Sequence, residues 1–437
     1  MSCKIRNFIV FTFVIMGMLP QIVEAQRLVT VSKGWSNNSV NATIFRKNSI
    51  VTHNDMQFVS YYNPDGYVVL AKRKLGDTEW QINKTQYRGN VKDAHNGINI
   101  MIDGDGFLHI SWDHHGHPLR YAKGVAPFSL ELGDKESMTG LNEMNVTYPE
   151  FYRMSDGNLI FMYRDGQSGK GNLVLNHYSL QSKTWKQIHA NLIGGQGQRN
   201  AYWQACLDSN GVIHLSWVWR ETPDVATNHD ICYARSSDSG ETWERTNGTK
   251  YDLPITAETS EYAFLIPQNS DLINQTSMTS DNAGRPYIAT YWKEKDSDVP
   301  QYHIVYYNGE RWQALNLNFR TLPFSIKGAG TKRIPVSRPQ VVAKIKENKT
   351  ILGLLFRDEE RQEKVSLASC DDITKNTWTI TDLTDFPVGS WEPSFDTELW
   401  KEQGLLHVFV QNVEQVDSEG QADVEPQVVQ VLEVDDF

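Results

Sequence analysis

The chain has 437 residues, of which 40% are hydrophobic and 11% aromatic, and its formal net charge at pH 7 is −11. This aromatic content excludes an intrinsically disordered chain. The acidic balance argues against a nucleic-acid partner, because an acidic surface repels phosphate backbones. Length alone suggests about three domains, an expectation that the pattern of repeats below replaces.

The first 25 residues have the pattern of a secretory signal. A basic start precedes an apolar run over residues 8–19, and Val23 and Ala25 supply small residues at the cleavage positions. The run is too short to cross a bilayer, and no later segment is a candidate. We expect residues 1–25 to be the signal, and residues 26–437 to be a secreted or periplasmic protein with no membrane partner.

One pattern recurs along the rest of the chain: a turn rich in Gly, Asp or Asn, a short β-rich strand, and then charged or aromatic residues. The strands are expected at residues 57–61, 107–112, 159–163, 212–217, 286–292, 351–356 and 405–410. Their starts lie roughly 50 to 75 residues apart, in the range for four-stranded propeller blades with loop insertions. A preceding apolar stretch and a tight turn predict a hairpin in most repeats.

Further strands complete these repeats. A third strand is expected at 67–72 and 231–235, and a tryptophan marks the fourth in several repeats, at Trp80, Trp185, Trp243, Trp312 and Trp378. Residues 236–243 form a complete Asp-box turn, and no window has sustained helical periodicity. We expect one all-β domain, a seven-bladed β-propeller with four antiparallel strands per blade, closed by residues 27–45 and 427–434.

The propeller geometry brings scattered polar side chains together. The first two strands of a blade are antiparallel, so the start of the first and the end of the second lie at the same end of the blade. Around a ring, these ends meet at one mouth. The residues expected there are His53, His95, Tyr148, Tyr202, Ser277, Arg338 and Trp391 from the starts, and Asp113, His114, His115, Arg164, Arg220, Lys293 and Arg357 from the ends.

The mouth is therefore expected to be basic although the whole protein is acidic. Its arginines suit a carboxylate or a sulfate group. Four tryptophans could offer flat faces to sugars, namely Trp203, Trp217, Trp219 and Trp391.

Structural interpretations compete at several of these positions. His109 and His214 lie inside strands and are expected to be packing residues. The histidines at 114, 115 and 117 flank a turn and leave metal binding open. Arg164 and Arg220 could instead form rim ion pairs with Asp165 and Glu221.

Three cysteines follow the expected signal, an odd number, so at least one has no intramolecular disulfide partner. We expect Cys206, Cys232 and Cys370 to be small core residues. A structural zinc site at Cys206, Cys232 and His229, or a bound calcium, stays open.

Several motifs in the chain resemble those of the seven-bladed propeller ulvan lyases, which are BNR-repeat polysaccharide lyases of family 25 with family 24 as relatives. The motifs are Asp93-Ala94-His95-Asn96-Gly97, Trp112-Asp113-His114-His115-Gly116-His117, Tyr148-Pro149-Glu150, Tyr163-Arg164-Asp165-Gly166 and Ala201-Tyr202-Trp203-Gln204. The resemblance runs from about residue 44 through the last repeat.

This resemblance implies cleavage of ulvan, an anionic sulfated polysaccharide, between 3-sulfated rhamnose and glucuronic or iduronic acid. The reaction is β-elimination, which leaves an unsaturated uronyl end. His95 and Tyr148 are implied as the proton-transfer pair and Arg164 as the group that neutralises the uronate carboxylate. His115 is implied as an assisting catalytic residue, with His114 and His117 as alternatives to it. The resemblance implies Tyr202 as a further substrate-positioning residue, and Trp203, Arg220, Arg338 and Arg357 are expected to bind substrate from their places at the mouth.

The chemistry asks for the same residue types independently of the family. The proton at C5 of a uronate becomes acidic only when the charge of its carboxylate is neutralised, which a fixed arginine achieves. A neutral imidazole or an activated phenol can then remove the proton, and a second such group can protonate the leaving oxygen. This scheme requires no cofactor, and we expect a monomer.

Two other functions stay open. An exported glycosidase of sialidase type would use an arginine triad drawn from Arg164, Arg220, Arg338 and Arg357, with Tyr148 beside Glu150, or two carboxylates from among Asp113, Glu150 and Glu392. The N-terminal arginine motif of sialidases is missing, and only residues 333–335 imitate it. A non-catalytic carbohydrate-binding propeller would use the same tryptophans and basic residues.

Overall fold

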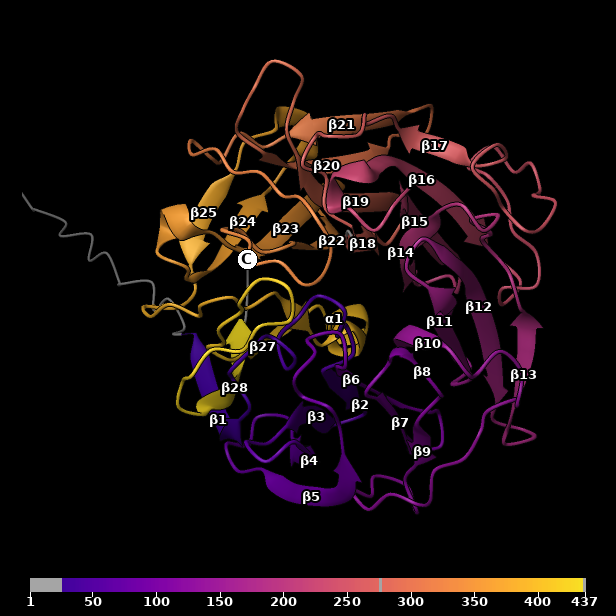
Figure 1. Ribbon diagram of the computed structural model, residues 1–437, viewed down its shortest axis with the longest axis vertical. Coiled ribbons are helices and arrows are strands. Elements are labelled where there is room, and N and C mark those ends of the chain that lie inside the picture. Colours follow the sequence, from indigo (N-terminus) through magenta and orange to yellow (C-terminus); the bar gives the residue numbers. More distant parts are fainter. Residues whose placement is uncertain (1–25, 275–276, 435–437) are drawn as a thin grey trace, which may run out of the picture.

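The computed structural model describes residues 26–274 and 277–434, which are almost entirely β-structure arranged as a ring (Figure 1). In these ranges the strands form seven sheets around a central axis, so the prediction of a seven-bladed β-propeller is confirmed. The expected secretory signal lies outside the described residues. Nowhere in the described ranges is a helix long and apolar enough to span a bilayer.

The first four blades follow the chain from the inner strand outward. Blade 1 contains β2 (Ile50–His53), β3 (Met56–Tyr62), β4 (Tyr67–Lys74) and β5 (Gln81–Arg88). Blade 2 contains β6 (Ile98–Ile102), β7 (Leu108–Trp112) and β9 (Tyr121–Lys123). Blade 3 contains β10 (Val146–Arg153), β11 (Leu159–Gln167), β12 (Lys170–Ser179) and β13 (Thr184–His189). Blade 4 contains β14 (Asn200–Leu207), β15 (Ile213–Arg220), β16 (Asn228–Ser236) and β17 (Glu261–Phe264).

The last three blades complete the ring. Blade 5 contains β18 (Ser277–Ser280), β19 (Pro286–Trp292), β20 (Gln301–Tyr307) and β21 (Trp312–Asn316). Blade 6 contains β22 (Gln340–Lys346), β23 (Lys349–Arg357), β24 (Val365–Cys370) and β25 (Thr379–Asp382). Blade 7 contains β26 (Ser394–Phe395), β27 (Leu406–Val410), β28 (Gln427–Val434) and β1 (Arg27–Gly34). Short 3-10 turns occur at η1 (Val225–Thr227), η2 (Glu359–Arg361) and η3 (Ile373–Lys375).

The ring closes through a strand from each end of the chain, as predicted. β1 pairs antiparallel with β28, which in turn pairs with β27, so the outermost strand of the last blade comes from the N-terminal side. This pairing removes a free sheet edge that would otherwise invite association with other chains.

Two features depart from the expected pattern. Blade 2 has three named strands instead of four, and the short strand β8 (His115–His117), which follows β7 in the chain, pairs with the inner strand of blade 3 instead. A helix, α1 (Thr397–Gln403), stands between β26 and β27. The Asp396 side chain accepts a hydrogen bond from the Leu399 N–H at its start, and Gly404 ends it in the left-handed region, with φ of 70°. At seven residues it is too short to show a helical period in the sequence.

The hydrophobic core lies between adjacent blades. One cluster joins side chains of blades 3, 4 and 5, among them Trp203, Trp217 and Trp219. Another joins blades 6, 7 and 1 across the closure and includes Trp391. Each four-stranded sheet therefore buries its faces against its neighbours, which is why the units require a closed ring.

The predicted Asp-box forms a turn that a network of hydrogen bonds defines. Asp238 accepts hydrogen bonds from the Thr242 backbone N–H at 2.8 Å and from the Thr242 hydroxyl at 2.6 Å. The indole of Trp243, only 1% exposed, donates to the Gly240 carbonyl at 3.0 Å. The turn lies after β16 in blade 4 and is a structural element.

His109 and His214 are packing residues, as predicted, and each belongs to the same buried arrangement in its blade. Asp103 accepts hydrogen bonds from the backbone of its own hairpin turn and lies 3.1 Å from His109 Nε2, while the Tyr121 hydroxyl lies 2.7 Å from His109 Nδ1. Asp208, His214 and Tyr233 repeat these contacts in blade 4. The unit joins the first turn of a blade to its second and third strands.

We expect Asp103→Asn to lower the free energy of unfolding by about 2–4 kcal/mol, because the fully buried site would lose the ion pair with Lys123 and the carboxylate that faces His109. Chemical denaturation measures the change. Asp105→Asn, in the same turn but half-exposed, serves as the control and should change stability by less than about 0.5 kcal/mol. Equal stabilities of the two variants would contradict a structural role for the buried unit.

Candidate functional site

A cavity of about 230 Å³ lies at the predicted mouth, where inner strands begin and second strands end. The strands that contribute to it, β8, β10, β11, β14 and β15, lie on one side of the ring (Figure 1). Seven residues singled out from the sequence line it: His95, His115, Tyr148, Arg164, Tyr202, Arg220 and Arg338. The predicted convergence of these side chains is therefore observed, while their chemical roles stay predictions.

Two histidines form the centre of one wall. The imidazole rings of His95 and His115 stack with centroids 4.0 Å apart, and Phe45 stacks on the other side of His95 at 4.6 Å. A single carboxylate, Asp93, holds both: its Oδ1 lies 2.9 Å from His95 Nδ1 and its Oδ2 lies 2.6 Å from His115 Nδ1. Because Nδ1 of each ring faces Asp93, Nε2 is the nitrogen left for a substrate.

The two stacked imidazoles differ in their protonation. Burial lowers the pKa of His95, but hydrogen bonds and charges from Asp93 and Glu419 outweigh burial and raise it to about 9. Burial also lowers the pKa of His115, and the positive charges of His95 and Arg164 add to this effect, so that its pKa stays below the usual value. At neutral pH, His95 is therefore an imidazolium and His115 a neutral imidazole.

His115 reaches this wall through the unexpected pairing of β8. Thr147 and Val146 on β10 are its partners in the sheet, and the Thr147 hydroxyl accepts a hydrogen bond from the Gly116 N–H at 2.8 Å. The strand thus carries His115 from the end of blade 2 to the inner edge of blade 3, next to His95. Of the three candidate histidines, only His115 lines the cavity.

Tyr148 lies at an irregularity in β10. The register between β10 and β11 shifts between Thr147 and Glu150, and Tyr148 has a φ of 56°, in the left-handed region that residues with side chains rarely adopt. Such a conformation costs roughly 1–2 kcal/mol for an L-residue, and bulges of this kind re-aim side chains beside functional sites. The phenol of Tyr148 turns into the cavity as a result.

Arg164 is the described residue of the cavity whose buried side-chain donors lack hydrogen-bond acceptors. Its side chain is 3% exposed, and Nη2 donates to the Thr147 hydroxyl at 3.2 Å. Nε and Nη1 have no hydrogen-bond partner within the described part of the chain. It forms no ion pair with Asp165, whose carboxylate instead accepts a hydrogen bond from Asn142. A buried guanidinium with two open donors calls for an anion.

The guanidinium groups of the other two arginines of the cavity have hydrogen-bond acceptors within the protein. Arg220 donates to the carbonyl oxygens of Thr222 and Pro223, and it does not pair with Glu221, which binds Arg199 and His229. Arg338 forms a bidentate ion pair with the buried Glu392, with N–O distances of 2.7 and 2.6 Å. Neither of the alternative rim ion pairs, with Asp165 or with Glu221, is present in the described structure.

The arginines set the properties of the two phenols. Burial raises the pKa of Tyr202, but the charges of Arg220 and Arg164 outweigh burial and lower it to about 8. Burial and the neighbouring Tyr202 raise the pKa of Tyr148 well above the usual value, despite the same arginines. Tyr202 is thus the phenol that loses its proton more easily, and Tyr148 keeps its proton.

Several residues expected at the mouth lie elsewhere. Trp203 does not face the cavity: it is 1% exposed and packs in the core between blades 3, 4 and 5, and the other three candidate tryptophans are equally buried. The prediction that they stack against sugars is wrong, because all four indoles are buried in the cores between blades. Ser277 and Lys293 also do not line the cavity.

Arg357 and His53 are misplaced for different reasons. Arg357, which was predicted to contact substrate, is 3% exposed and donates to the carbonyl oxygens of Ile334, Pro335, Val336 and Trp391, so it supports the loop behind the cavity wall. His53 ends β2 instead of beginning it, and it lies beside Arg153 at the opposite end of the ring. His114 and His117 serve the turn by accepting hydrogen bonds from the backbone N–H groups of Arg120 and His115.

The sequence analysis missed the residues that support the histidines. The sequence predicts no role for Asp93, Glu419, Phe45 or Thr331. Asp93 precedes His95 by two residues and could have been recognised as a partner for it. The other three come from distant segments, and no local pattern reveals them.

The distances between the candidate metal donors do not suit a bound ion. In the described ranges, the one group of three candidate donors is Asp93, His95 and His115, whose donor atoms lie within 4.8 Å of one another. The Asp93 oxygens lie 2.9 and 2.6 Å from the imidazole nitrogens, which are hydrogen-bond distances too short for two ligands on one tetrahedral ion. Cys206, Cys232 and His229 are not grouped as donors, and His229 binds Glu221 and Asp230. All three cysteines are free.

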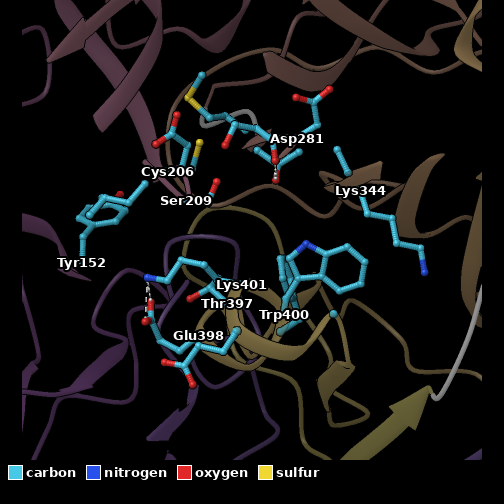
Figure 2. Close-up of a pocket in the computed structure, with 18 of the residues that line it drawn as sticks. Tyr152, Cys206, Ser209, Asp281, Lys344, Thr397, Glu398, Trp400 and Lys401 are labelled. Atoms are coloured by element: carbon cyan, nitrogen blue, oxygen red, sulfur yellow. Dashed lines mark hydrogen bonds and ion pairs between the residues drawn. The ribbon is translucent and has the colours of Figure 1, made fainter. Parts of the chain in front are cut away.

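A second cavity, of about 410 Å³, opens at the other end of the inner strands (Figure 2). Tyr152 and Cys206 contribute from β10 and β14, and Trp400 and Lys401 contribute from α1. Lys401 lies 2.8 Å from Glu398 and forms an ion pair with it. None of the predicted catalytic or substrate-binding residues lines this cavity, so the smaller cavity is the candidate active site.

Comparisons with known proteins identify a family for the chain and relatives of similar fold. A sequence model described as BNR repeat-containing family member matches residues 56–320. The long isoform of an ulvan lyase from Glaciecola sp. (strain KUL10) is 23% identical over 190 residues, which are 32% of this chain and 19% of that protein. The match therefore spans about a fifth of that relative's length.

Solved structures share the fold over nearly the whole chain. The polysaccharide lyase Uly1 has a TM-score of 0.68 at 15% identity, covering 94% of this chain and 100% of its own. A family 25 ulvan lyase bound to GlcA(1-4)Rha3S also has a TM-score of 0.68, at 14% identity, covering 94% and 96%. At this level of identity, the likeness shows a common architecture.

Proposed function

The chain belongs to the BNR repeat-containing family, and on this premise we propose that it is a polysaccharide lyase that cleaves ulvan by β-elimination. The bond cleaved joins 3-sulfated rhamnose to a glucuronic or iduronic acid, and the product carries an unsaturated uronyl end. The observation that carries the proposal is the buried Arg164 with two open donors in a cavity of histidines and tyrosines.

Arg164 would bind the uronate carboxylate through these donors. Neutralising that charge makes the C5 proton more acidic and stabilises the enediolate that forms when the proton leaves. The site is pre-organised for this step, because Thr147 and the Tyr148 ring, 5.0 Å from the guanidinium carbon, hold Arg164 in place before the substrate arrives.

The remaining side chains divide into proton acceptors and proton donors. The neutral imidazole of His115 and the phenolate form of Tyr202 are the two groups able to accept the C5 proton. His95 and Tyr148 are protonated at neutral pH and suit the opposite task, donation of a proton to the leaving rhamnose oxygen. The C4–O bond breaks as the C4–C5 double bond forms, so one proton leaves carbon and one arrives at oxygen.

The residues that line the cavity do not suit a glycosidase. Hydrolysis of the usual kind uses two carboxylates at the scissile bond, yet none of the described residues that line the cavity is an Asp or a Glu. The expected pairing of Tyr148 with Glu150 does not occur, because Glu150 accepts its hydrogen bond from Tyr152. Glu392 is engaged by Arg338.

Incubation of the purified protein with ulvan tests the proposal. We expect ultraviolet absorbance of an unsaturated uronyl product to rise together with new reducing ends. Reducing ends without that absorbance would indicate hydrolysis. Binding of ulvan with neither signal would indicate a carbohydrate-binding propeller, and either outcome would overturn the proposal.

A further inference from the structure

Glu419 stands in the segment between β27 and β28, far along the chain from the histidines. Its carboxylate joins three segments: Oε1 accepts hydrogen bonds from the Thr331 N–H at 2.9 Å and the Thr331 hydroxyl at 2.6 Å, and Oε2 accepts from the Ala94 N–H at 3.1 Å. Oε1 also lies 3.3 Å from His95 Nδ1. Ser418 and Glu419 both have φ near 60°, in a tight turn that an antiparallel bridge between Val416 and Gly420 closes.

Two carboxylates therefore converge on one imidazole nitrogen. Asp93 Oδ1 lies 2.9 Å from His95 Nδ1, and Glu419 Oε1 lies 3.3 Å from the same atom. Their side chains are 21% and 26% exposed, so solvent screens their mutual repulsion only in part. An imidazolium between the two carboxylates offsets this repulsion, whereas a neutral ring would leave two negative charges facing each other.

The other groups around His95 do not supply this charge balance. His115 on β8 stacks on one face, Phe45 covers the other, and the Tyr148 ring on β10 lies 5.9 Å away. The Thr331 hydroxyl is 3.4 Å from Nδ1 and is neutral. His115 and the more distant Arg164 could only add positive charge, so the negative charges that face His95 come from Asp93 and Glu419.

We propose that Glu419 is a positioning residue, which acts with Asp93 to hold His95 as an imidazolium whose Nε2–H faces the substrate. This inference rests on the proposed lyase function and deepens it: His95 becomes the donor that delivers a proton to the leaving oxygen. In the same step His95 passes from imidazolium to neutral imidazole, and solvent returns the proton after the product leaves.

The position of Glu419 ties this proton donor to closure of the ring. The segment that carries it leads directly into β28, which pairs with β1. Pairing of the strands from the two ends of the chain therefore places the last carboxylate of the site. The catalytic wall is complete only when blade 7 is complete.

Glu419→Gln tests the proposal in the whole protein, since glutamine keeps the size and one of the two acceptor oxygens but removes the charge. The first readout is the titration of His95 by nitrogen NMR of labelled imidazoles, which needs no substrate. We expect the wild-type ring to titrate at about 9, and the variant ring to titrate about one to three pH units lower. Glu414→Gln, which changes a carboxylate of the same segment that has no hydrogen bond or ion pair with His95 in the described structure, is the control and should leave the titration unchanged.

The second readout is the pH profile of kcat/KM on ulvan. In Glu419→Gln the alkaline limb should move to lower pH by the same amount as the titration, and Glu419→Asp should restore part of the shift. A His95 titration that stays unchanged in folded Glu419→Gln would overturn the proposal. A shifted titration in a protein without eliminase activity would instead overturn the lyase function, and leave the link between Glu419 and His95 standing.

Discussion

Arg164→Ala should lower kcat/KM on ulvan by about 10²–10³-fold. Arg164 is 3% exposed, and two of its guanidinium nitrogens have no partner in the described structure. The substrate carboxylate would accept the hydrogen bonds that these two nitrogens can donate. The carboxylate is charged in the ground state and becomes part of the enediolate as the proton leaves. Removal of Arg164 should therefore affect kcat as well as KM.

Two further variants separate the geometry of the Arg164 guanidinium from the effect of positive charge alone. Arg164→Lys keeps the positive charge but loses the planar fork, and its activity should fall between those of the wild type and Arg164→Ala. Lys92→Ala removes one positive charge from an exposed position on the loop that carries His95, and its activity should stay close to wild type. Turnover by Arg164→Ala within tenfold of wild type would remove the neutralisation argument.

His115→Ala should lower kcat by about 10²–10⁴-fold if the neutral imidazole removes the C5 proton. The pH profile separates this role from that of Tyr202. With His115 as the base, activity should rise through a pKa below the ordinary histidine value and be constant from pH 7 upward until the donor titrates. With Tyr202 as the base, activity should rise through a pKa near 8.

Matched variants make the comparison specific. His117→Ala removes a histidine of the same turn that does not line the cavity, and it should cost less than about tenfold. Tyr202→Phe should remove the rise near pH 8 only if the phenolate is the base. An unchanged rate in both His115→Ala and Tyr202→Phe would exclude each as the essential acceptor.

Much of the fold could be predicted from the sequence because its signals are local. Apolar stretches and turn residues repeat along the chain, a marker tryptophan occurs in several repeats, and all seven expected second strands occur within a few residues of their predicted positions. Closure by the strands from the two ends also follows from the pattern, since an open ring would leave unpaired edges. The helix α1 was not predicted, because seven residues are too few for a helical period to be recognised in the sequence.

Part of the candidate site could also be predicted from the sequence, and part could not. Antiparallel hairpins in a ring determine which strand ends share a mouth, and this rule placed His95, Tyr148, Arg164, Tyr202, Arg220 and Arg338 correctly. It failed where the side chain pointed between blades, as at Trp203, or where the guanidinium turned back to the main chain, as at Arg357. Position along a strand does not specify the direction of a side chain next to a bulge or a loop.

The sequence by itself determined the repeating unit, the number of blades and the types of side chain that gather at the mouth. These depend on spacing and periodicity within short segments. The tertiary structure alone decided the charge of each group, because protonation depends on partners that are distant in the chain. Asp93 and Glu419 make His95 a cation, β8 brings His115 against it, and Arg164 is left with open donors. The acidic chain thus forms a basic mouth through contacts that net charge does not reveal.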